Sequence, residues 1–467
     1  MTKTMKTIST LLAVACLLAT APLFAQTDAE REVAARLAGG ALIDGKAWDK
    51  LAYLTDRIGH RLSGSEGLAK AVTWTAEEFK RDGIPKVWTE EVMVPHWVRG
   101  KEAARIVAPV EWDLALLALG GSVGTPEGGI TAEVIEVDSL EQLNERKDEV
   151  KGKIVLFNKA IEAGFDAKYG YGSAVPMRVV GPSRAARHGA VGMLIRSLGT
   201  ADFRLPHTGT LRYEDGLPKI PSAAIASEGA ELIHRLLASG DPVKVHMELG
   251  AKTLPDALSH NVIADIPGRE KPEEIVLIGG HLDSWDVGQG AHDDGAGCAI
   301  VMEVMRLIQK SGMKPRRTIR AVLFTNEENG LRGGRDYEKR HGHETHVAAI
   351  ESDSGGAEPV GFGVSAGEGG VAMIEEIASM LEFIDAHRVA SRGGGADISP
   401  LRVHGVPLMN LRQQSFNYFD YHHTEADTLD KINRQNLNKN VAALAVMTWL
   451  LAEREETLPR NEPQEGD

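Results

Sequence analysis

The sequence predicts an α/β protein: a mainly parallel mixed sheet with helices on both faces, plus an inserted β-rich domain. Two observations lead to this fold class. From residue 261 onward, short strand-like segments alternate with helical ones, a pattern typical of strands joined by helical crossovers. Between residues 105 and 254 the chain has short β-type runs separated by Gly- and Pro-rich turns, which indicates a separate unit. The 467 residues are too many for one compact core and fit this division.

The first residues have the features of a secretory signal peptide. Two lysines precede the apolar run 8–18, and small residues then lead to Ala21 and Ala25. We expect a signal peptide over residues 1–25, with Ala21 as the alternative cleavage point, and hence an exported protein, either periplasmic or secreted. Because the apolar run is too short to cross a bilayer and no later stretch replaces it, no stable membrane anchor is expected.

The helices of the main domain are predicted from apolar residues that recur every three or four positions. They cover residues 30–42, 48–58, 68–81, 298–309, 332–339, 371–383 and 438–453. The strands are predicted from short apolar runs between turns. They cover residues 261–266, 274–279, 318–324, 347–352 and 408–411. The main domain is therefore expected to comprise residues 26–104 and 255–467.

The inserted domain, residues 105–254, is predicted from the same kind of short apolar run. Its strands are expected over residues 105–110, 131–137, 153–158, 192–195, 222–225 and 243–249, with one helix over 228–239. Clusters of Gly and Pro between these runs predict turns. The unit is therefore expected to be rich in strands.

The composition is that of a soluble globular protein with an excess of negative charge. Hydrophobic residues make up 43% and charged residues 25% of the chain, which argues against disorder. The net charge of −14 argues against nucleic acid or an anionic membrane as a partner. After signal cleavage Cys298 is the remaining cysteine, so no intrachain disulfide is expected. We expect it to be a buried small side chain.

Histidines and carboxylates gather where successive predicted strands end. The five motifs are Gly280-His281-Leu282-Asp283, His292-Asp293-Asp294-Gly295, Asn326-Glu327-Glu328, Asp353-Ser354-Gly355 and His422-His423-Thr424 with Asp427. Singly, each is typical of a helix cap or an exposed face. Because open α/β sheets place their ligand sites at the carboxyl ends of strands, five motifs in this order indicate one shared site. Imidazole and carboxylate groups without thiolates suit zinc or a similar divalent metal in a hydrolytic centre.

These motifs, together with the stretch 54–65, resemble the zinc exopeptidases of clan MH over most of the mature chain. The resemblance implies the zinc aminopeptidase fold, two Zn²⁺ ions per chain, and hydrolysis of dipeptides or other short peptides. A homodimer is implied in the same way. Whether the substrate is recognised by its free α-amino group or its free α-carboxylate stays open. Aminopeptidase, carboxypeptidase and dipeptidase activities therefore all remain.

Under this resemblance, each metal ligand of the family falls on one residue of this chain. His281 and Asp353 would hold one zinc, Glu328 and His423 would hold the other, and Asp293 would bridge both. A hydrolytic site with two metal ions needs such a bridging carboxylate, because the ions lie about 3.5 to 4 Å apart.

The same resemblance assigns two residues outside the ligand set. Glu327 would be free to act as the general base. Asp283 would accept the second ring N–H of His281 and so fix the tautomer of that ligand. His422 and His423 are adjacent, and the family pattern, which places the ligand directly before the threonine, favours His423.

Residues 152–156 and 185–195 resemble a protease-associated domain, although another small α/β insertion would show similar runs. Two other functions are weighed. One is a non-catalytic ectodomain on the same scaffold, as in transferrin-receptor-like proteins; the complete ligand set and the base argue against it. The other is a glutaminyl-cyclase-like transferase on the related fold, against which the insertion and the full bridging set argue.

Overall fold

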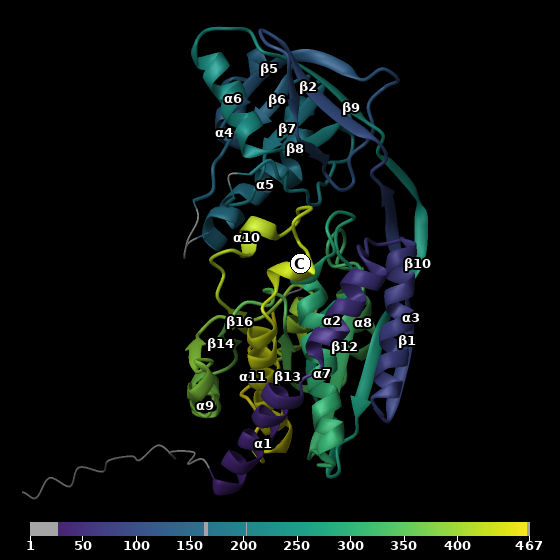
Figure 1. Cartoon of the computed structure of the whole chain (residues 1–467), viewed down its shortest axis with the longest axis vertical. Coiled ribbons are helices and arrows are strands. Elements are labelled where there is room, and N and C mark those ends of the chain that lie inside the picture. The colour runs from purple at the N-terminus through teal and green to yellow at the C-terminus, as the bar shows by residue number, and fades with distance from the viewer. Residues whose placement is uncertain (1–26, 163–166, 202, 465–467) are drawn as a thin grey trace, which may run out of the picture.

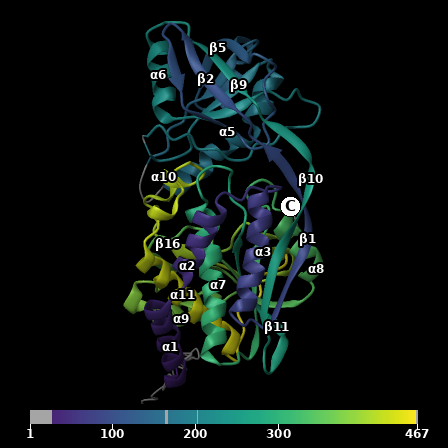
Figure 2. The ribbon, with the colours of Figure 1, turned by 45° about the vertical axis from the view of Figure 1, so that its right-hand side comes forward.

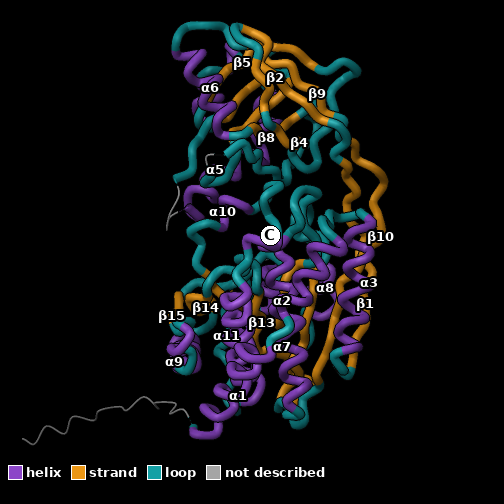
Figure 3. The backbone as a smooth tube through the Cα atoms, viewed as in Figure 1, coloured by secondary structure: helices purple, strands orange, loops and turns teal. Residues whose placement is uncertain are grey.

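The computed structural model describes residues 27–162, 167–201 and 203–464. The predicted signal peptide, residues 1–25, lies outside the described residues. The described chain forms two bodies stacked along the long axis, each built on an eight-stranded sheet (Figure 1). Figure 3 shows the strands of both sheets in orange. Within the described ranges no helix is long and apolar enough to cross a membrane.

The lower body contains the first sheet, which is mixed. In sheet order its strands are β1 (Lys86–Val98), β10 (Lys252–Ile266), β12 (Arg317–Phe324), β11 (Lys271–His281), β13 (Thr345–Glu351), β16 (Leu408–Gln413), β14 (Pro359–Ser365) and β15 (Arg388–Ala390). β11 runs parallel to β12 and β13, and β13 runs parallel to β16. β10 pairs antiparallel with both β1 and β12, and β14 pairs antiparallel with β16 but parallel with β15.

Helices cover both faces of this sheet, as predicted. Along β11, Val276 and Ile278 belong to one hydrophobic core, and Ile275 and Leu277 belong to another, since successive side chains of a strand point to opposite faces. The larger core includes α1 (Asp28–Asp44), α2 (Ala47–Tyr53), α3 (Glu66–Arg81), α7 (Ala296–Ser311), α9 (Gly370–Ser379) and α11 (Arg434–Glu453). The smaller core includes α8 (Arg332–His341). The predicted α/β fold class is confirmed.

The upper body interrupts the lower one between β1 and β10. Its sheet has the strand order β3 (Trp112–Leu114), β2 (Glu102–Ala108), β9 (Lys244–Leu249), β5 (Ile130–Val137), β6 (Ile154–Phe157), β7 (Gly192–Arg196), β8 (Ser222–Ile225) and β4 (Leu116–Ala118). Its helices are α4 (Leu140–Glu145), α5 (Ala167–Arg187) and α6 (Ser227–Ala238). We call residues 102–249 the inserted module. The division of the chain into domains at residues 105 and 254 stays a prediction.

A two-stranded ribbon joins the two bodies. β1 and β10 pair antiparallel from Lys86 opposite Asp265 to Val98 opposite Lys252, and they lie side by side in both Figure 1 and Figure 2. β1 was not predicted, and β10 begins earlier than the predicted residue 261. The early part of β10 was missed because it is mostly exposed. It therefore lacks the apolar run by which a strand is recognised in a sequence.

α8 is tied to β1 by His341, and this contact makes a testable prediction about stability. His341 Nε2 lies 2.9 Å from Glu90 and Nδ1 lies 3.2 Å from Glu344. Burial opposes the charge, but the hydrogen bonds to Glu344 and Glu90 prevail and raise the pKa of His341 to about 9. Because this folded-state pKa lies above the ordinary value of about 6.5, the contribution to stability is complete below pH 6.5 and is lost as the pH rises through 9.

We therefore expect His341→Gln to lower the free energy of unfolding at pH 6 and to have little effect above pH 9. Urea unfolding of both proteins at a series of pH values measures the difference. The exposed His343 provides a matched control, His343→Gln, whose effect on the free energy of unfolding should be small. A difference for His341→Gln that stays constant from pH 6 to 9.5 would contradict the assignment.

Candidate metal centre

The five predicted motifs meet at one edge of the first sheet, facing the inserted module. β11 ends at His281, β12 is followed by the loop that carries Glu327 and Glu328, and β13 is followed by Asp353. The chain after β16 supplies His423. β12 and β13 each pair parallel with β11, and β16 pairs parallel with β13. The carboxyl ends of all four strands therefore lie at the same edge of the sheet, where α/β sheets place ligand sites.

Asp293 is shared by two groups of possible ligands. One group consists of His281, Asp293 and Asp353, and the other of Asp293, Glu328 and His423, with ligand atoms within 4.8 Å of one another in each group. Asp293 Oδ1 lies 3.1 Å from His281 Nε2, and its Oδ2 lies 3.1 Å from His423 Nε2. One carboxylate therefore offers one oxygen atom to each group.

The remaining members complete the two groups. Asp353 Oδ1 lies 3.6 Å from His281 Nε2, and Glu328 Oε2 lies 3.0 Å from His423 Nε2. The structure thus brings together all five residues that the sequence resemblance assigned as ligands. Their contacts form the two groups that the resemblance implied, with His281 and Asp353 in one, Glu328 and His423 in the other, and Asp293 in both.

The chemistry of this donor set fits zinc. It combines three carboxylates with two imidazoles and has no thiolate, a combination suited to zinc in hydrolytic sites. Glu328 Oε1 is buried and has no hydrogen-bond partner among the described residues, a costly condition for a carboxylate oxygen. Burial and the neighbouring Asp293 raise the pKa of Glu328 to about 7. A divalent cation would supply the missing partner and favour the ionised carboxylate.

Two further carboxylates hold the backbone around Asp293. Asp427 accepts hydrogen bonds from the backbone N–H groups of His292 (2.6 Å) and Asp293 (3.1 Å), and burial raises its pKa to about 7. Asp294 accepts from the N–H groups of His281 (3.1 Å) and Gly297 (3.0 Å). The sequence analysis placed both residues within the five motifs but gave neither of them a role.

The contacts of Asp283 differ from the expectation. Its carboxylate accepts hydrogen bonds from the backbone N–H groups of Glu327 (3.0 Å) and Glu328 (3.2 Å). His281 Nδ1 instead lies 3.1 Å from the backbone carbonyl oxygen of Asp283 and 3.9 Å from its carboxylate. Asp283 therefore contacts His281 through its main chain, and its side chain fixes the loop that carries Glu327.

Glu327 lies beside both ligand groups without belonging to either of them. Its carboxylate has no hydrogen bond to any described residue, and its backbone is held by Asp283. Burial and the nearby carboxylates of Glu328, Asp353 and Asp293, partly offset by His281, raise the pKa of Glu327 well above its usual range. Positive ions between the two groups would reverse the sign of that field and lower this pKa.

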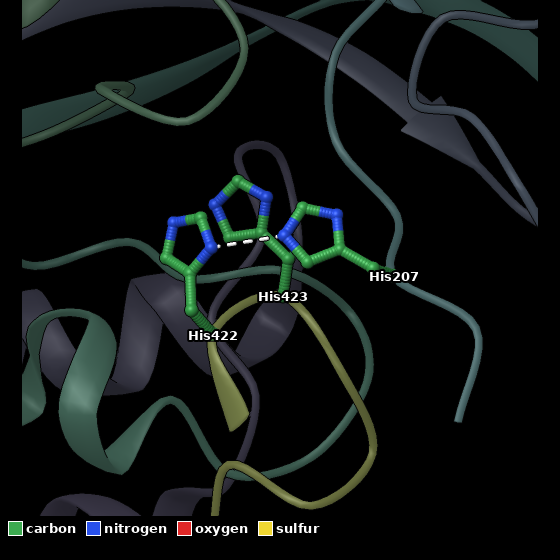
Figure 4. A group of neighbouring side chains, drawn as sticks. All are labelled: His207, His422 and His423. Carbon is green, nitrogen blue, oxygen red and sulfur yellow. Dashed lines mark hydrogen bonds between the residues drawn. The ribbon is translucent and has the colours of Figure 1, made fainter. Parts of the chain in front are cut away.

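The geometry favours His423 over His422 as the metal ligand. His423 Nε2 contacts both Asp293 and Glu328, whereas His422 Nε2 contacts Asp293 alone among the ligand carboxylates, at 3.2 Å. His422 Nδ1 lies 2.9 Å from Nε2 of His207 in the inserted module. Figure 4 shows His207 approaching the two adjacent histidines from a separate segment. The sequence analysis missed His207, because no motif surrounds it.

Arg61 holds the loop between His281 and Asp293 in place. This side chain is fully buried, and it donates hydrogen bonds to the carbonyl oxygens of Gly59, Leu282, Gln289 and Gly290 at 2.8 to 2.9 Å. It lies within the stretch 54–65, which the sequence analysis noted without giving it a role. The stretch therefore connects the N-terminal helices to the metal centre.

We expect Arg61→Met to lower the free energy of unfolding by at least about 3 kcal/mol, because a buried acceptor left without a donor costs roughly 1–3 kcal/mol. Urea unfolding measures the change. The matched control is Arg57→Met, since Arg57 is an exposed arginine of the same stretch. Equal effects of the two substitutions would contradict the role given to Arg61.

Cys298 contacts the main chain of the candidate ligand His281, and it is buried, as predicted, with a free thiol. Its Sγ donates a hydrogen bond to the carbonyl oxygen of His281 at 3.0 Å. Burial and the nearby Asp294 raise the pKa of the Cys298 thiol well above its ordinary value. It therefore stays a protonated thiol, which is a poor nucleophile.

Solved structures with a similar fold indicate the class of protein. The structure of a peptidase M28 precursor from Shewanella amazonensis superposes with a TM-score of 0.91 at 40% identity, covering 94% of this chain and 100% of that one. A zinc aminopeptidase from Bacillus subtilis shares the fold, with a TM-score of 0.65 at 18% identity over 88% of this chain and 95% of its own. Together with the candidate metal ligands, these similarities indicate a metallopeptidase.

Sequence comparison then gives the family. The profile described as peptidase family M28 matches residues 261–448, the part of the chain that supplies all five candidate ligands. Carboxypeptidase Q of Mus musculus is 40% identical over 418 residues, covering 89% of this chain and 87% of that protein. The chain belongs to peptidase family M28, and its substrates are peptides.

Proposed function

We propose that this chain is an exported exopeptidase with two zinc ions, which hydrolyses dipeptides or other short peptides. The observation that carries the proposal is the placement of Asp293, with one carboxylate oxygen 3.1 Å from a histidine of each ligand group. Export is inferred from the N-terminal sequence, and the protein would act in the periplasm or outside the cell.

His281, Asp353 and Asp293 would hold one zinc ion, and Glu328, His423 and Asp293 the other. When bound, the ions would lower the pKa of a water molecule and stabilise negative charge on the carbonyl oxygen of the substrate. Glu327 would accept a proton from the attacking water and pass it to the leaving amine. Asp283 supports this role by holding the backbone N–H groups of Glu327 and Glu328.

The inserted module supports a preference for short substrates. Its segment around Thr208 forms a backbone hydrogen bond to the carbonyl oxygen of His423 at 3.0 Å, and Thr200 bonds to the carbonyl oxygen of Phe419 at 3.1 Å. The module thus lies against the loop that carries the candidate ligand His423 and covers this part of the site. A chain end fits such a covered site more readily than the middle of a long polypeptide.

The two alternative functions predict different metal contents and activities. A transferase of the glutaminyl-cyclase type would use one metal ion. A non-catalytic ectodomain would need no general base, yet Glu327 lies beside both groups with its carboxylate free of hydrogen bonds to other described residues. The complete set of ligands around Asp293 therefore favours the peptidase.

The test is release of amino acids from a panel of free, N-acetylated and C-amidated dipeptides. Each is incubated with purified protein loaded with zinc, with protein treated with a chelator, and with Glu327→Gln. We expect cleavage that the chelator and the substitution both abolish. The blocked terminus that prevents cleavage identifies the recognised end. No cleavage of any dipeptide by zinc-loaded protein would overturn the proposal.

A further inference from the structure

A segment of the inserted module reaches into the metal centre. His207 and Thr208 lie between β7 and β8, and both side chains are fully buried. In Figure 4 the imidazole of His207 lies beside those of His422 and His423, which belong to the lower body. The ring centroid of His207 lies 5.1 Å from that of His422 and 4.9 Å from that of His423.

Two hydrogen bonds join Thr208 to the candidate ligand His423. The N–H of Thr208 donates to the carbonyl oxygen of His423 at 3.0 Å, and His423 Nδ1 lies 3.3 Å from the carbonyl oxygen of Thr208. A carbonyl oxygen can only accept, so Nδ1 of His423 carries the proton. In the neutral ring, Nε2 is then the nitrogen with a free lone pair, and it is the atom that faces Asp293 and Glu328, as a metal ligand must.

A hydrogen bond and a close polar contact connect His207 to the bridging carboxylate. His207 Nε2 is hydrogen-bonded to His422 Nδ1 at 2.9 Å, and His422 Nε2 lies 3.2 Å from Asp293 Oδ2. A carboxylate has no proton to offer when it is ionised, so a neutral His422 places its own proton on Nε2, facing Asp293, and its Nδ1 accepts from His207. The contacts run from His207 through His422 to Asp293.

Two elements of the inserted module, α5 and β4, fix this segment. Arg178 of α5, which is 5% exposed, donates to the carbonyl oxygen of Thr208 at 3.4 Å and to the hydroxyl of Tyr171 at 2.9 Å. The Tyr171 ring packs edge-on against His422, with the centroids 5.3 Å apart. Thr208 Oγ1 donates to the carbonyl oxygen of Ala118 at 2.9 Å. The position of Thr208 is thus set by the fold of the inserted module.

We infer that His207 is a positioning residue of the metal centre, which orients the bridging carboxylate through His422 while the adjoining Thr208 backbone orients His423. The inserted module is then a part of the metal site as well as its cover. This inference rests on the proposed function, because it concerns the two zinc ions that Asp293 would bridge.

The test compares two substitutions of His207 in the full chain. His207→Leu removes the donor to His422, whereas His207→Gln keeps an N–H donor at a similar reach. Zinc affinity is measured by competition with a chromogenic chelator, and ligand geometry by the visible spectrum of the cobalt-substituted protein. We expect His207→Leu to weaken zinc binding by about 10- to 100-fold and to alter the cobalt spectrum. His207→Gln should restore most of both properties.

His234→Leu is the matched control, because His234 is an exposed histidine of α6 at the far end of the inserted module (Figure 1). It should behave like the wild-type protein. If His207→Leu does not fold, His207→Asn replaces it, since the shorter amide cannot reach His422.

The outcomes distinguish a failure of the proposed function from a failure of the role inferred for His207. Wild-type protein that binds no zinc would overturn the proposed function and this inference with it. Wild-type protein that binds two zinc ions, together with a His207→Leu variant of equal zinc affinity and unchanged cobalt spectrum, would overturn the inference alone. A loss that His207→Gln does not restore would also overturn it, because the effect would then come from packing.

Discussion

Glu327→Gln should lower kcat by about 10²- to 10⁴-fold, the range that a positioned acid–base group contributes, while both zinc ions stay bound. The reason is its position: Glu327 lies beside the two ligand groups but in neither of them. Glutamine keeps the shape of the side chain and the backbone bonds to Asp283, so removal of the base is the main change.

The measurement is kcat on a dipeptide together with zinc content determined by elemental analysis. Glu328→Gln provides the matched control, since Glu328 contacts His423 directly and its loss should reduce the zinc content. A Glu327→Gln protein that loses zinc as readily as Glu328→Gln would show that Glu327 is a ligand. Full activity in the variant would remove it from the mechanism altogether.

Asp293→Ala should abolish activity by removing both metal ions. Each carboxylate oxygen of Asp293 faces a different histidine, so one substitution removes a ligand from both groups. Asp353→Ala should behave differently, because Asp353 belongs to one group only, and it should retain about one ion per chain.

Zinc per chain, measured after gel filtration in metal-free buffer, distinguishes these cases. We expect a progressive loss from wild type through Asp353→Ala to Asp293→Ala, with melting temperatures that rise on addition of zinc only where a site remains. Retention of two ions by Asp293→Ala would exclude a bridging role.

Much of the metal centre could be predicted from the sequence because the strands that carry it are buried and parallel. All residues of β12 and most of β11 and β13 are buried, which gives continuous apolar runs in the sequence. A polar motif after each run then marks the carboxyl edge of the sheet. Strand order and strand direction thus predict one shared site at this edge, whereas the role of each residue within it was implied by the family resemblance.

Other features could not be predicted because their causes lie outside the local sequence. α5 forms although Pro176 and Pro182 lie within it, and proline ordinarily breaks a helix. His207 contacts His422 from 215 positions away along the chain, and no local pattern encodes such a contact. The carboxylate of Asp283 bonds to two amides of another loop, which depends on the folded backbone.

The ribbon formed by β1 and β10 bears on how such a chain could have arisen. Val98 and Lys252 are direct partners at the end of that ribbon, so the whole inserted module occupies the place of a hairpin turn. A two-residue loop joining these positions would leave every strand pairing of the first sheet in place. In evolutionary terms, the module could have entered an ancestral hairpin in one event without changing the register of the sheet, and its contacts with the histidines would then be a later acquisition.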